Sequence, residues 1–258
     1  MILFGITGGI GHGKSVLADD FGRIEPNSLH LESSTVIAAV IDGMHARLAR
    51  VPSPHKLDQI NAWLQALPDI LAQTLHRTVS YDTVKITIAD ITARPEFYEK
   101  LFIHLENLAK NPALLRAGIT PANKREYRPM LQWLGSYLVA KVDPGIWYTE
   151  LVRQAHEAEA RGVALCTIGG VRFPNDADAI HTANGRIIHI VRPFMSEPDK
   201  SDPTERERSK IVADITITND AGLAELIVCA EHIYEDVKLG KLQRRYVTSE
   251  IDEKSFRK

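Results

Sequence analysis

The 258-residue sequence predicts a three-layer α/β fold, in which helices cover a five-stranded parallel sheet and a helical insertion follows the second strand. Three observations predict this fold. Apolar runs of strand length recur near both ends of the chain. Apolar residues at helical spacing lie between these runs. The stretch from 51 to 161 shows mostly the helical spacing, so we expect it to form an insertion rather than part of the sheet.

Each strand is expected where a short apolar run ends in polar or glycine residues. These runs cover 2–6, the middle of 26–34, 163–168, 186–191 and 214–218. Helices are expected over 35–50, 125–141, 146–161, 175–183 and 221–237. Asn219 and Asp220 are expected to cap the last of these helices. Residues 83–88 alternate like a strand but have no place in the sheet.

The expected elements divide the chain into four parts. Residues 1–50 and 162–240 form the core, and residues 51–161 form a helical substrate-binding insertion. Residues 193–210 are charged and lack apolar periodicity, which is typical of a lid-like loop. Residues 241–258 form a polar tail.

The first strand leads directly into a glycine-rich segment. Residues 8–15 fit G-x-x-x-x-G-K-[ST], the pattern of a phosphate-binding P-loop, and they stand between a strand and a helix as that motif requires. Glycines let backbone N–H groups turn toward a phosphate, and the start of the next helix adds its positive end. The predicted nucleotide-binding residues are Gly8, Gly9, Gly11, His12, Gly13, Lys14, Ser15 and Val16. A glycine-rich turn that matches the pattern by chance is the alternative.

Two side chains at the end of this motif carry its expected chemistry. Lys14 stands where a P-loop lysine reaches the β- and γ-phosphates, and Ser15 stands where a hydroxyl binds Mg²⁺. The sequence therefore predicts ATP and Mg²⁺ as ligands, with Lys14 catalytic and Ser15 a metal ligand.

The overall composition is that of an ordinary globular protein. A net charge of −2 argues against a general nucleic-acid-binding surface. No apolar stretch is long enough to span a membrane, and the short N-terminal apolar run leads into the glycine-rich segment rather than a signal-peptide cleavage site. Cys166 and Cys229 lie in apolar runs, as buried free thiols do, so we expect a reducing cytoplasm.

Further candidates follow the other strands, because parallel sheets bind ligands at the carboxyl ends of their strands. Glu32 would orient a substrate hydroxyl or a metal-bound water; a surface glutamate at a helix start is the alternative. Arg172 has the planar charge that matches phosphate oxygens; an ion pair with a carboxylate is its alternative. Arg206, with Arg208 nearby, would close over the phosphates as a catalytic cation of the lid; a solvated loop is the alternative.

The insertion contributes a pair of candidates for an acceptor site. Arg128 and Gln132 are four residues apart, so they share a face of the expected helix. An arginine for a phosphate beside an amide for a base edge suits nucleotide recognition. Amphipathic helices also expose such residues without any binding role.

Several of these segments together resemble one family, the bacteriophage type of deoxynucleoside monophosphate kinase. That family has a similar P-loop, an R-x-x-L-Q-x-x-G helix, a downstream Trp, and D-V-R-F-P-N-E. Here they are matched by residues 7–15, 128–135, Trp147 and 170–176. Residues 187–193 and 215–226 resemble its last strands and final helix, and the likeness is weakest from 51 to 123.

The resemblance implies an ATP-dependent, Mg²⁺-dependent kinase that phosphorylates a deoxynucleoside monophosphate to the diphosphate, in the host cytoplasm if the chain is of phage origin. It implies that Arg128 and Gln132 contact the monophosphate, that Trp147 shapes its pocket, and that Arg172 faces the reacting phosphates. Its partners would be small nucleotides. Whether the chain forms a homodimer stays open.

Two residues depart from the family pattern. Gly170 replaces the first Asp of D-V-R-F-P-N-E, so Mg²⁺ would rely on Ser15 with another carboxylate such as Glu32, or catalysis would be weak. His12 replaces a small loop residue but is compatible with phosphate binding, because only its backbone N–H is needed. Two alternatives therefore stay open: dephospho-coenzyme A kinase, which has a similar P-loop, and a nucleotide-binding regulatory protein with little catalysis.

Overall fold

The computed structural model describes residues 1–193, 195 and 207–251, and the chain divides into two compact units. The sheet unit comprises Met1–Ser33 and Leu151–Lys258, and the helical unit comprises Ser34–Glu150. The helical unit thus begins earlier and ends earlier than the predicted insertion. Helix α2 (Ser33–Ala46), expected in the core, belongs almost wholly to the helical unit, because its residues pack there: Ile37 lies against Gly135.

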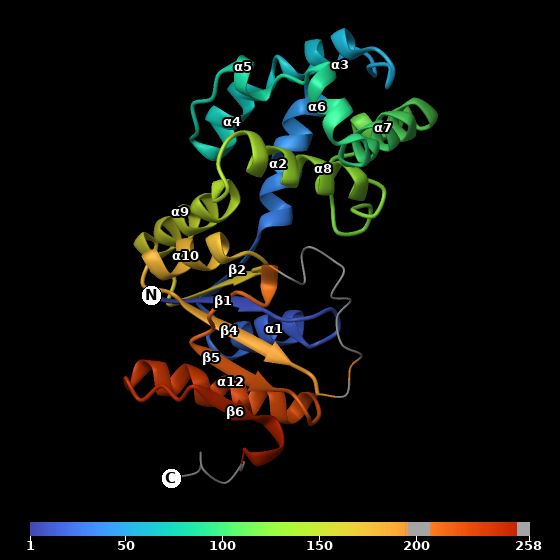
Figure 1. Ribbon diagram of the computed structural model, residues 1–258. Helices are drawn as coiled ribbons and strands as arrows, with labels where there is room; N and C mark the ends of the chain where they lie inside the picture. Colours follow the sequence, from blue (N-terminus) through green and yellow to red (C-terminus); the bar gives the residue numbers. More distant parts are fainter. Residues whose placement is uncertain (194, 196–206, 252–258) are drawn as a thin grey trace. The chain divides into compact units, whose positions relative to one another are not determined.

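The strands that the structure describes form one parallel sheet of six, in the order β2-β3-β1-β4-β5-β6 (Figure 1). Their bounds are β1 Ile2–Thr7, β2 Ser28–Glu32, β3 Leu165–Gly169, β4 Arg186–Val191, β5 Ile215–Thr218 and β6 Arg245–Val247. The parallel α/β architecture confirms the prediction. The count of five strands was wrong by one, because β6 forms within the expected polar tail.

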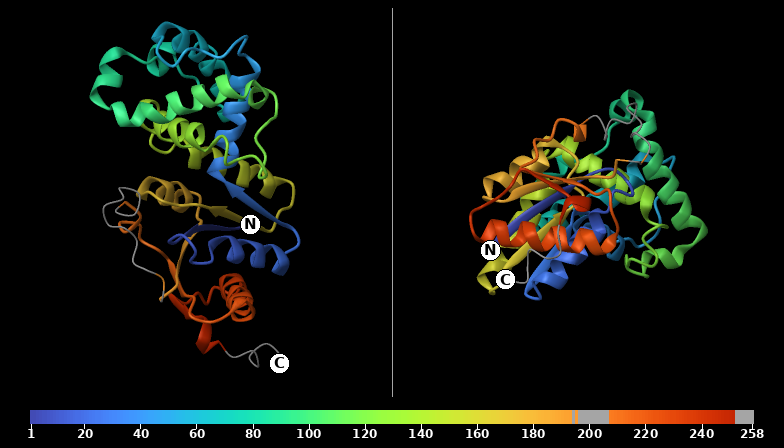
Figure 2. Two further views of the ribbon diagram at one scale, coloured as in Figure 1. Left: turned by 90° about the vertical axis from the view of Figure 1, so that its right-hand side faces the viewer. Right: turned by 90° about the horizontal axis from the view of Figure 1, so that it is seen from below.

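Helices cover both faces of this sheet, which makes three layers. Helices α1 (Lys14–Ile24) and α12 (Leu223–Lys238) lie side by side on one face (Figures 1 and 2). Helix α10 (Pro174–Thr182) packs on the other face, against β1 and β4. The central strands are apolar on both faces, as strands covered on both sides must be.

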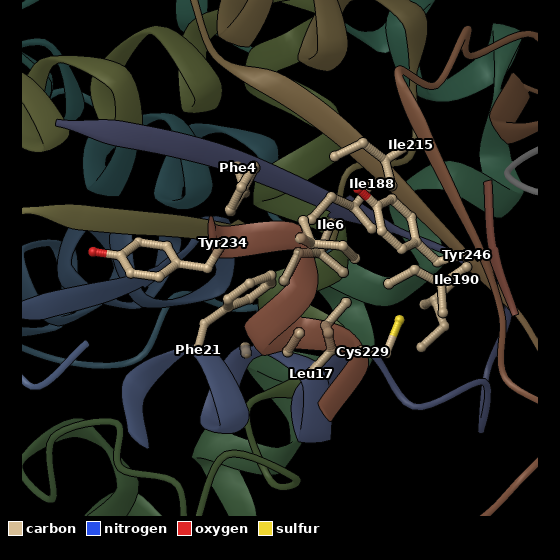
Figure 3. Packing of buried hydrophobic residues seen from close by; sticks show 14 of the residues in the cluster. Phe4, Ile6, Leu17, Phe21, Ile188, Ile190, Ile215, Cys229, Tyr234 and Tyr246 are labelled. Atoms are coloured by element: carbon tan, nitrogen blue, oxygen red, sulfur yellow. The ribbon is translucent and has the colours of Figure 1, made fainter. Parts of the chain in front are cut away.

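The main core lies between the sheet and the α1/α12 layer (Figure 3). Phe4 and Ile6 point into it, while Gly5 between them faces Ile180 of α10. From the helices, Leu17 and Phe21 meet Cys229 and its neighbours on α12. Successive side chains of a strand point to opposite faces, so β1 contributes to both layers. This packing holds the carboxyl end of β1 in the middle of the sheet.

In the described part of the chain the helical unit consists of helices of 4 to 16 residues. Besides α2, they are α3 Leu57–Leu64, α4 Leu67–Leu75, α5 Tyr81–Val84, α6 Ile88–Ala93, α7 Pro95–Lys110, the 3₁₀ turn η1 Pro112–Leu115 and α8 Arg128–Lys141. Helix α9 (Ile146–Ala160) runs across the boundary between the two units. A second 3₁₀ turn, η2 (Thr248–Glu250), follows β6 in the sheet unit.

The strand-like alternation of residues 83–88 has a simple origin. Val84 and Ile86 are buried, whereas Lys85 and Thr87 between and after them are not. The segment is the end of α5 and an extended link to α6, and it pairs with no strand. None of the helices that the structure describes is both long enough and apolar enough to cross a membrane.

Candidate functional site

Residues 8–13, called here the glycine-rich loop, connect β1 to α1 at the carboxyl end of β1. Gly8, Gly11 and Gly13 have positive φ angles of 152°, 79° and 106°. Residues with a Cβ rarely adopt such angles, which is why this curled path requires glycine. Gly13 is the N-cap of α1, so the loop delivers its last peptide directly to the positive end of an 11-residue helix.

The first residues of α1 carry the polar groups expected to meet a ligand. Lys14 is half-buried, and its Nζ donates to the carbonyl oxygens of Gly8 at 2.9 Å and Gly9 at 2.6 Å. Its ammonium group therefore lies over the loop rather than out in solvent. Ser15 is exposed, and Val16 packs at the edge of the core.

His12 anchors the loop with its side chain as well as its backbone. The ring is buried, and its Nδ1 lies 3.3 Å from the Ile190 carbonyl oxygen and 3.4 Å from the Arg192 backbone nitrogen. One of these contacts forms in each tautomer of a neutral ring, because Nδ1 either donates or accepts. The large side chain at this position thus packs on the end of β4.

The turn after β3 lies beside the end of β1. The Thr7 hydroxyl donates to the Val171 carbonyl oxygen at 2.7 Å. Asp176 Oδ2 accepts the backbone N–H groups of Arg172 and Phe173, both at 3.0 Å. Burial raises the pKa of Asp176 to about 6, although these two N–H groups and the Arg172 charge oppose the rise. The turn therefore presents the exposed Arg172 side chain from a fixed backbone.

Glu32 lies two strands away from β1, at the carboxyl end of β2. At the usual strand spacing this is about 10 Å from β1. Its Oε1 is 3.7 Å from Nε2 of His30, and its side chain lies beside Gly169 of β3. Glu32 therefore lies at the carboxyl end of β2, as predicted, and its carboxylate is near the ring of His30.

A half-buried histidine and an arginine lie close together at the end of β4. Burial is the main cause that lowers the pKa of His189, and His12 and Arg208 lower it further. Arg208 comes from the segment expected to act as a lid, so at least this part of the segment carries charge toward β4. Arg206, the cation predicted to be catalytic, lies outside the described residues, as does most of the predicted lid.

The predicted acceptor residues belong to the helical unit. Arg128 and Gln132 are both exposed and share a face of α8, as their spacing predicts. Trp147 is buried, and its Nε1 donates to the Gly135 carbonyl oxygen at 2.9 Å. The structure therefore shows Trp147 joining α9 to α8, with its ring nitrogen already used.

Sequence reasoning missed two residues that hold the ends of the strands in place. Asp176 fixes the turn after β3, and Asn219, expected to be a helix cap, instead donates from Nδ2 to the His12 carbonyl oxygen at 3.0 Å. A polar residue directly after a buried strand was the available signal for Asn219. Its partner lies more than 200 residues away, which no local pattern reveals.

Taken together, the carboxyl ends of four adjacent strands bring together a positive, N–H-rich surface in the sheet unit. It consists of the glycine-rich loop after β1, the Arg172 turn after β3, the end of β4 and Asn219 after β5. Such a surface is suited to binding a polyphosphate. No protein-family model matches the chain, and no curated protein is significantly similar to it in sequence.

Proposed function

We propose that this protein is a nucleotide kinase that binds ATP at the glycine-rich loop and phosphorylates a deoxynucleoside monophosphate. The observation that carries the proposal is the loop itself: three positive-φ glycines lead from a central parallel strand to a helix that begins with Lys14 and Ser15. This geometry fits a triphosphate, because backbone N–H groups, a helix start and an ammonium group converge within a few residues.

Lys14 would have the principal binding role. The contacts of its ammonium group include the carbonyl oxygens of Gly8 and Gly9, which are uncharged acceptors. Phosphate oxygens carry full charge and form stronger hydrogen bonds with an ammonium group. Lys14 would therefore turn from the loop to the β- and γ-phosphates and neutralise charge that develops during transfer.

Arg172 would add a second positive charge from the turn after β3, held in place by Asp176 through its backbone N–H. Ser15 would hold Mg²⁺, and its exposed hydroxyl is free of the crowding that would prevent such a role. When bound, Mg²⁺ would neutralise phosphate charge. In this proposal Arg128 binds the phosphate of the acceptor and Gln132 binds its base. Both side chains are exposed on one face of α8, where a ligand can reach them.

A second candidate function is nucleotide binding with little catalysis. It is favoured by Gly170, which has a φ angle of 73° and provides no carboxylate where the resembling kinases have an Asp. Such a protein would bind ATP and transfer phosphate to none of the acceptors tested. It would act as a regulatory or assembly component.

The first prediction tests the kinase proposal through Lys14. Lys14→Ala removes the only lysine or arginine among residues 8–15. We expect phosphoryl transfer to fall by a factor of about 10³ or more, because catalysis here depends on charge neutralisation. ATP consumption is measured against each deoxynucleoside monophosphate and against dephospho-coenzyme A.

The matched control is Lys241→Ala, which removes an exposed lysine after α12. Both variants should retain the wild-type far-UV circular dichroism spectrum and melting temperature. Near-normal turnover in the Lys14 variant would rule out the kinase proposal. Nucleotide binding without transfer to any acceptor, in the wild-type protein, would favour the second candidate.

A further inference from the structure

Asn219 makes a contact that its position in the sequence does not explain. It follows β5 directly, and its backbone N–H donates to the Val191 carbonyl oxygen at 2.7 Å. Its side chain is 5% exposed, and Nδ2 donates to the His12 carbonyl oxygen at 3.0 Å. The side chain of this buried asparagine therefore reaches the glycine-rich loop.

Capping of α12 does not account for this asparagine. Helix α12 begins at Leu223 with Gly222 as its N-cap, and the Gly222 N–H donates to Glu225 Oε2 at 2.9 Å. Asn219 lies three residues before that cap. Its side-chain amide donates to the glycine-rich loop, and the N-cap of α12 has no side-chain cap hydrogen bond.

The contact fixes the direction of one peptide plane. A trans peptide holds its C=O and its N–H on opposite sides. Because the His12 carbonyl points to Asn219, the N–H of Gly13 in the same peptide points away from Asn219. An inverted peptide would instead turn a carbonyl oxygen toward a bound phosphate and repel it.

Two further contacts leave this peptide little freedom. The His12 ring is held against the end of β4, so the residue before the peptide is anchored. A Cβ added to Gly13 would lie 2.8 Å from Asn219 Nδ2, so the amide packs directly on the Gly13 backbone. Gly13 has a φ angle of 106°, and glycine at this position leaves room for the Asn219 amide.

We propose that Asn219 is a positioning residue for nucleotide binding, which sets the His12–Gly13 peptide so that the Gly13 N–H donates to a phosphate. The inference rests on the proposed function, because it requires a phosphate at the glycine-rich loop. Asn219 itself touches no phosphate. It acts through the backbone of the loop.

The test compares Asn219→Asp, Asn219→Ala and the control Asn184→Asp. Aspartate has the shape of asparagine, but its ionised carboxylate cannot donate to the His12 carbonyl and attracts the Gly13 N–H instead. Asn184 is exposed at a positive-φ turn before β4, at the opposite edge of the sheet, and it undergoes the same change of charge. Binding of a fluorescent ATP analogue and the melting temperature are measured for all variants.

We expect the dissociation constant to rise about fivefold for Asn219→Ala, as for the loss of one buried neutral hydrogen bond. For Asn219→Asp we expect the dissociation constant to rise roughly thirtyfold or more, since the ionised carboxylate then repels the His12 carbonyl oxygen. Asn184→Asp should bind as the wild type does. In activity assays the KM for ATP should rise while the KM for the acceptor stays unchanged.

A pH profile separates positioning from a general loss of structure. In the Asn219→Asp variant, protonation of the introduced carboxylate restores a donor for the His12 carbonyl. The affinity of this variant relative to Asn219→Ala should therefore improve from pH 8 to pH 5. The other side chains around the loop, His12 and His189 among them, are the same in both variants, so taking the ratio removes their contribution.

Two results overturn the inference in distinguishable ways. If the wild type binds the analogue and Asn219→Asp binds it as tightly as Asn184→Asp, the positioning role is wrong while the proposed function stands. If the wild type binds no nucleotide, the proposed function is wrong and the inference is overturned with it.

Discussion

At the scale of single residues, Gly170 shows how a backbone angle and a functional group compete for one position. Its φ angle of 73° lies in the left-handed region, where any residue with a Cβ is disfavoured. Aspartate tolerates this region better than most residues, since its short side chain bonds locally. We therefore expect the turn after β3 to accommodate an aspartate at position 170 with only a small loss of stability.

The second prediction follows from this comparison. We expect Gly170→Asp and Gly170→Ala each to lower the free energy of unfolding by about 1 kcal/mol, because both force a Cβ into the left-handed region. If the proposed kinase activity is correct, the Asp variant should be about tenfold more active than the Ala variant at limiting Mg²⁺, through added support for the metal. Urea unfolding and Mg²⁺ titration of activity measure the two effects. Equal activities would show that this position has no part in metal binding.

At the scale of elements, a buried histidine pair joins α2 to α7 in the helical unit. His45 Nε2 and His104 Nε2 are 3.1 Å apart, and the two rings are nearly parallel. Burial lowers the pKa of His45 to about 4; burial and then His45 lower the pKa of His104 to about 3. One ring donates and the other accepts, so the accepting ring must be neutral and protonation of both rings breaks the contact.

The third prediction is an acid-sensitive helical unit. Because both folded pKa values lie below the ordinary value near 6.5, the unfolded chain binds more protons between about pH 6.5 and pH 4. The pair's contribution to stability is therefore present above pH 6.5 and is lost as the pH falls toward 4. We expect the free energy of unfolding to drop by about 2–4 kcal/mol from pH 7 to pH 5.

Tryptophan fluorescence measures this effect selectively, since Trp63, Trp133 and Trp147 all lie in the helical unit. The matched variant replaces both His45 and His104 by leucine, which removes both polar partners together and leaves neither unsatisfied. Its unfolding should depend much less on pH over the same range. The same slope in both proteins would assign the acid sensitivity to other groups.

At the scale of the whole molecule, residues 245–247 of the expected polar tail are part of the sheet. Tyr246 of β6 is buried in the main core (Figure 3), and its hydroxyl donates to Asp236 Oδ2 at 2.7 Å. Thr248 lies just beyond, fully buried, and its hydroxyl oxygen accepts the N–H groups of Asp220 and Ala221. Strand β6 thus closes the sheet beside β5.

The fourth prediction tests that role. Tyr246→Ala should lower the free energy of unfolding by about 3–5 kcal/mol, as for a large aromatic side chain lost from a core. Tyr246→Phe should lower it by about 1 kcal/mol, because it loses only the hydrogen bond to Asp236. Far-UV circular dichroism during urea unfolding reports both values. If Tyr246→Ala left the free energy of unfolding almost unchanged, β6 would not contribute to the stability of the sheet.

Local patterns were sufficient for most elements of the sheet. The apolar runs that become β1 and β3 are visible in the sequence because these strands are buried on both faces, and those that become β4 and β5 are visible because their isoleucines are buried. Strand β6 was not predicted, since its three residues include two side chains outside the core and only Tyr246 enters it. The boundary of the helical unit was misplaced for a related reason. Helix α2 looks the same in the sequence whichever unit it packs against.

The candidate site likewise has a part that the sequence predicts and a part that only the tertiary structure shows. The order of strand, glycines, Lys14 and Ser15 is local, so the sequence by itself determined the glycine-rich loop and the type of ligand that we propose for it. Only the tertiary structure decided what holds that loop: the contacts of His12 with the end of β4 and of Asn219 with the His12 carbonyl. These contacts join residues 178 and 207 positions apart, and such pairs become neighbours only when parallel strands bring their carboxyl ends together.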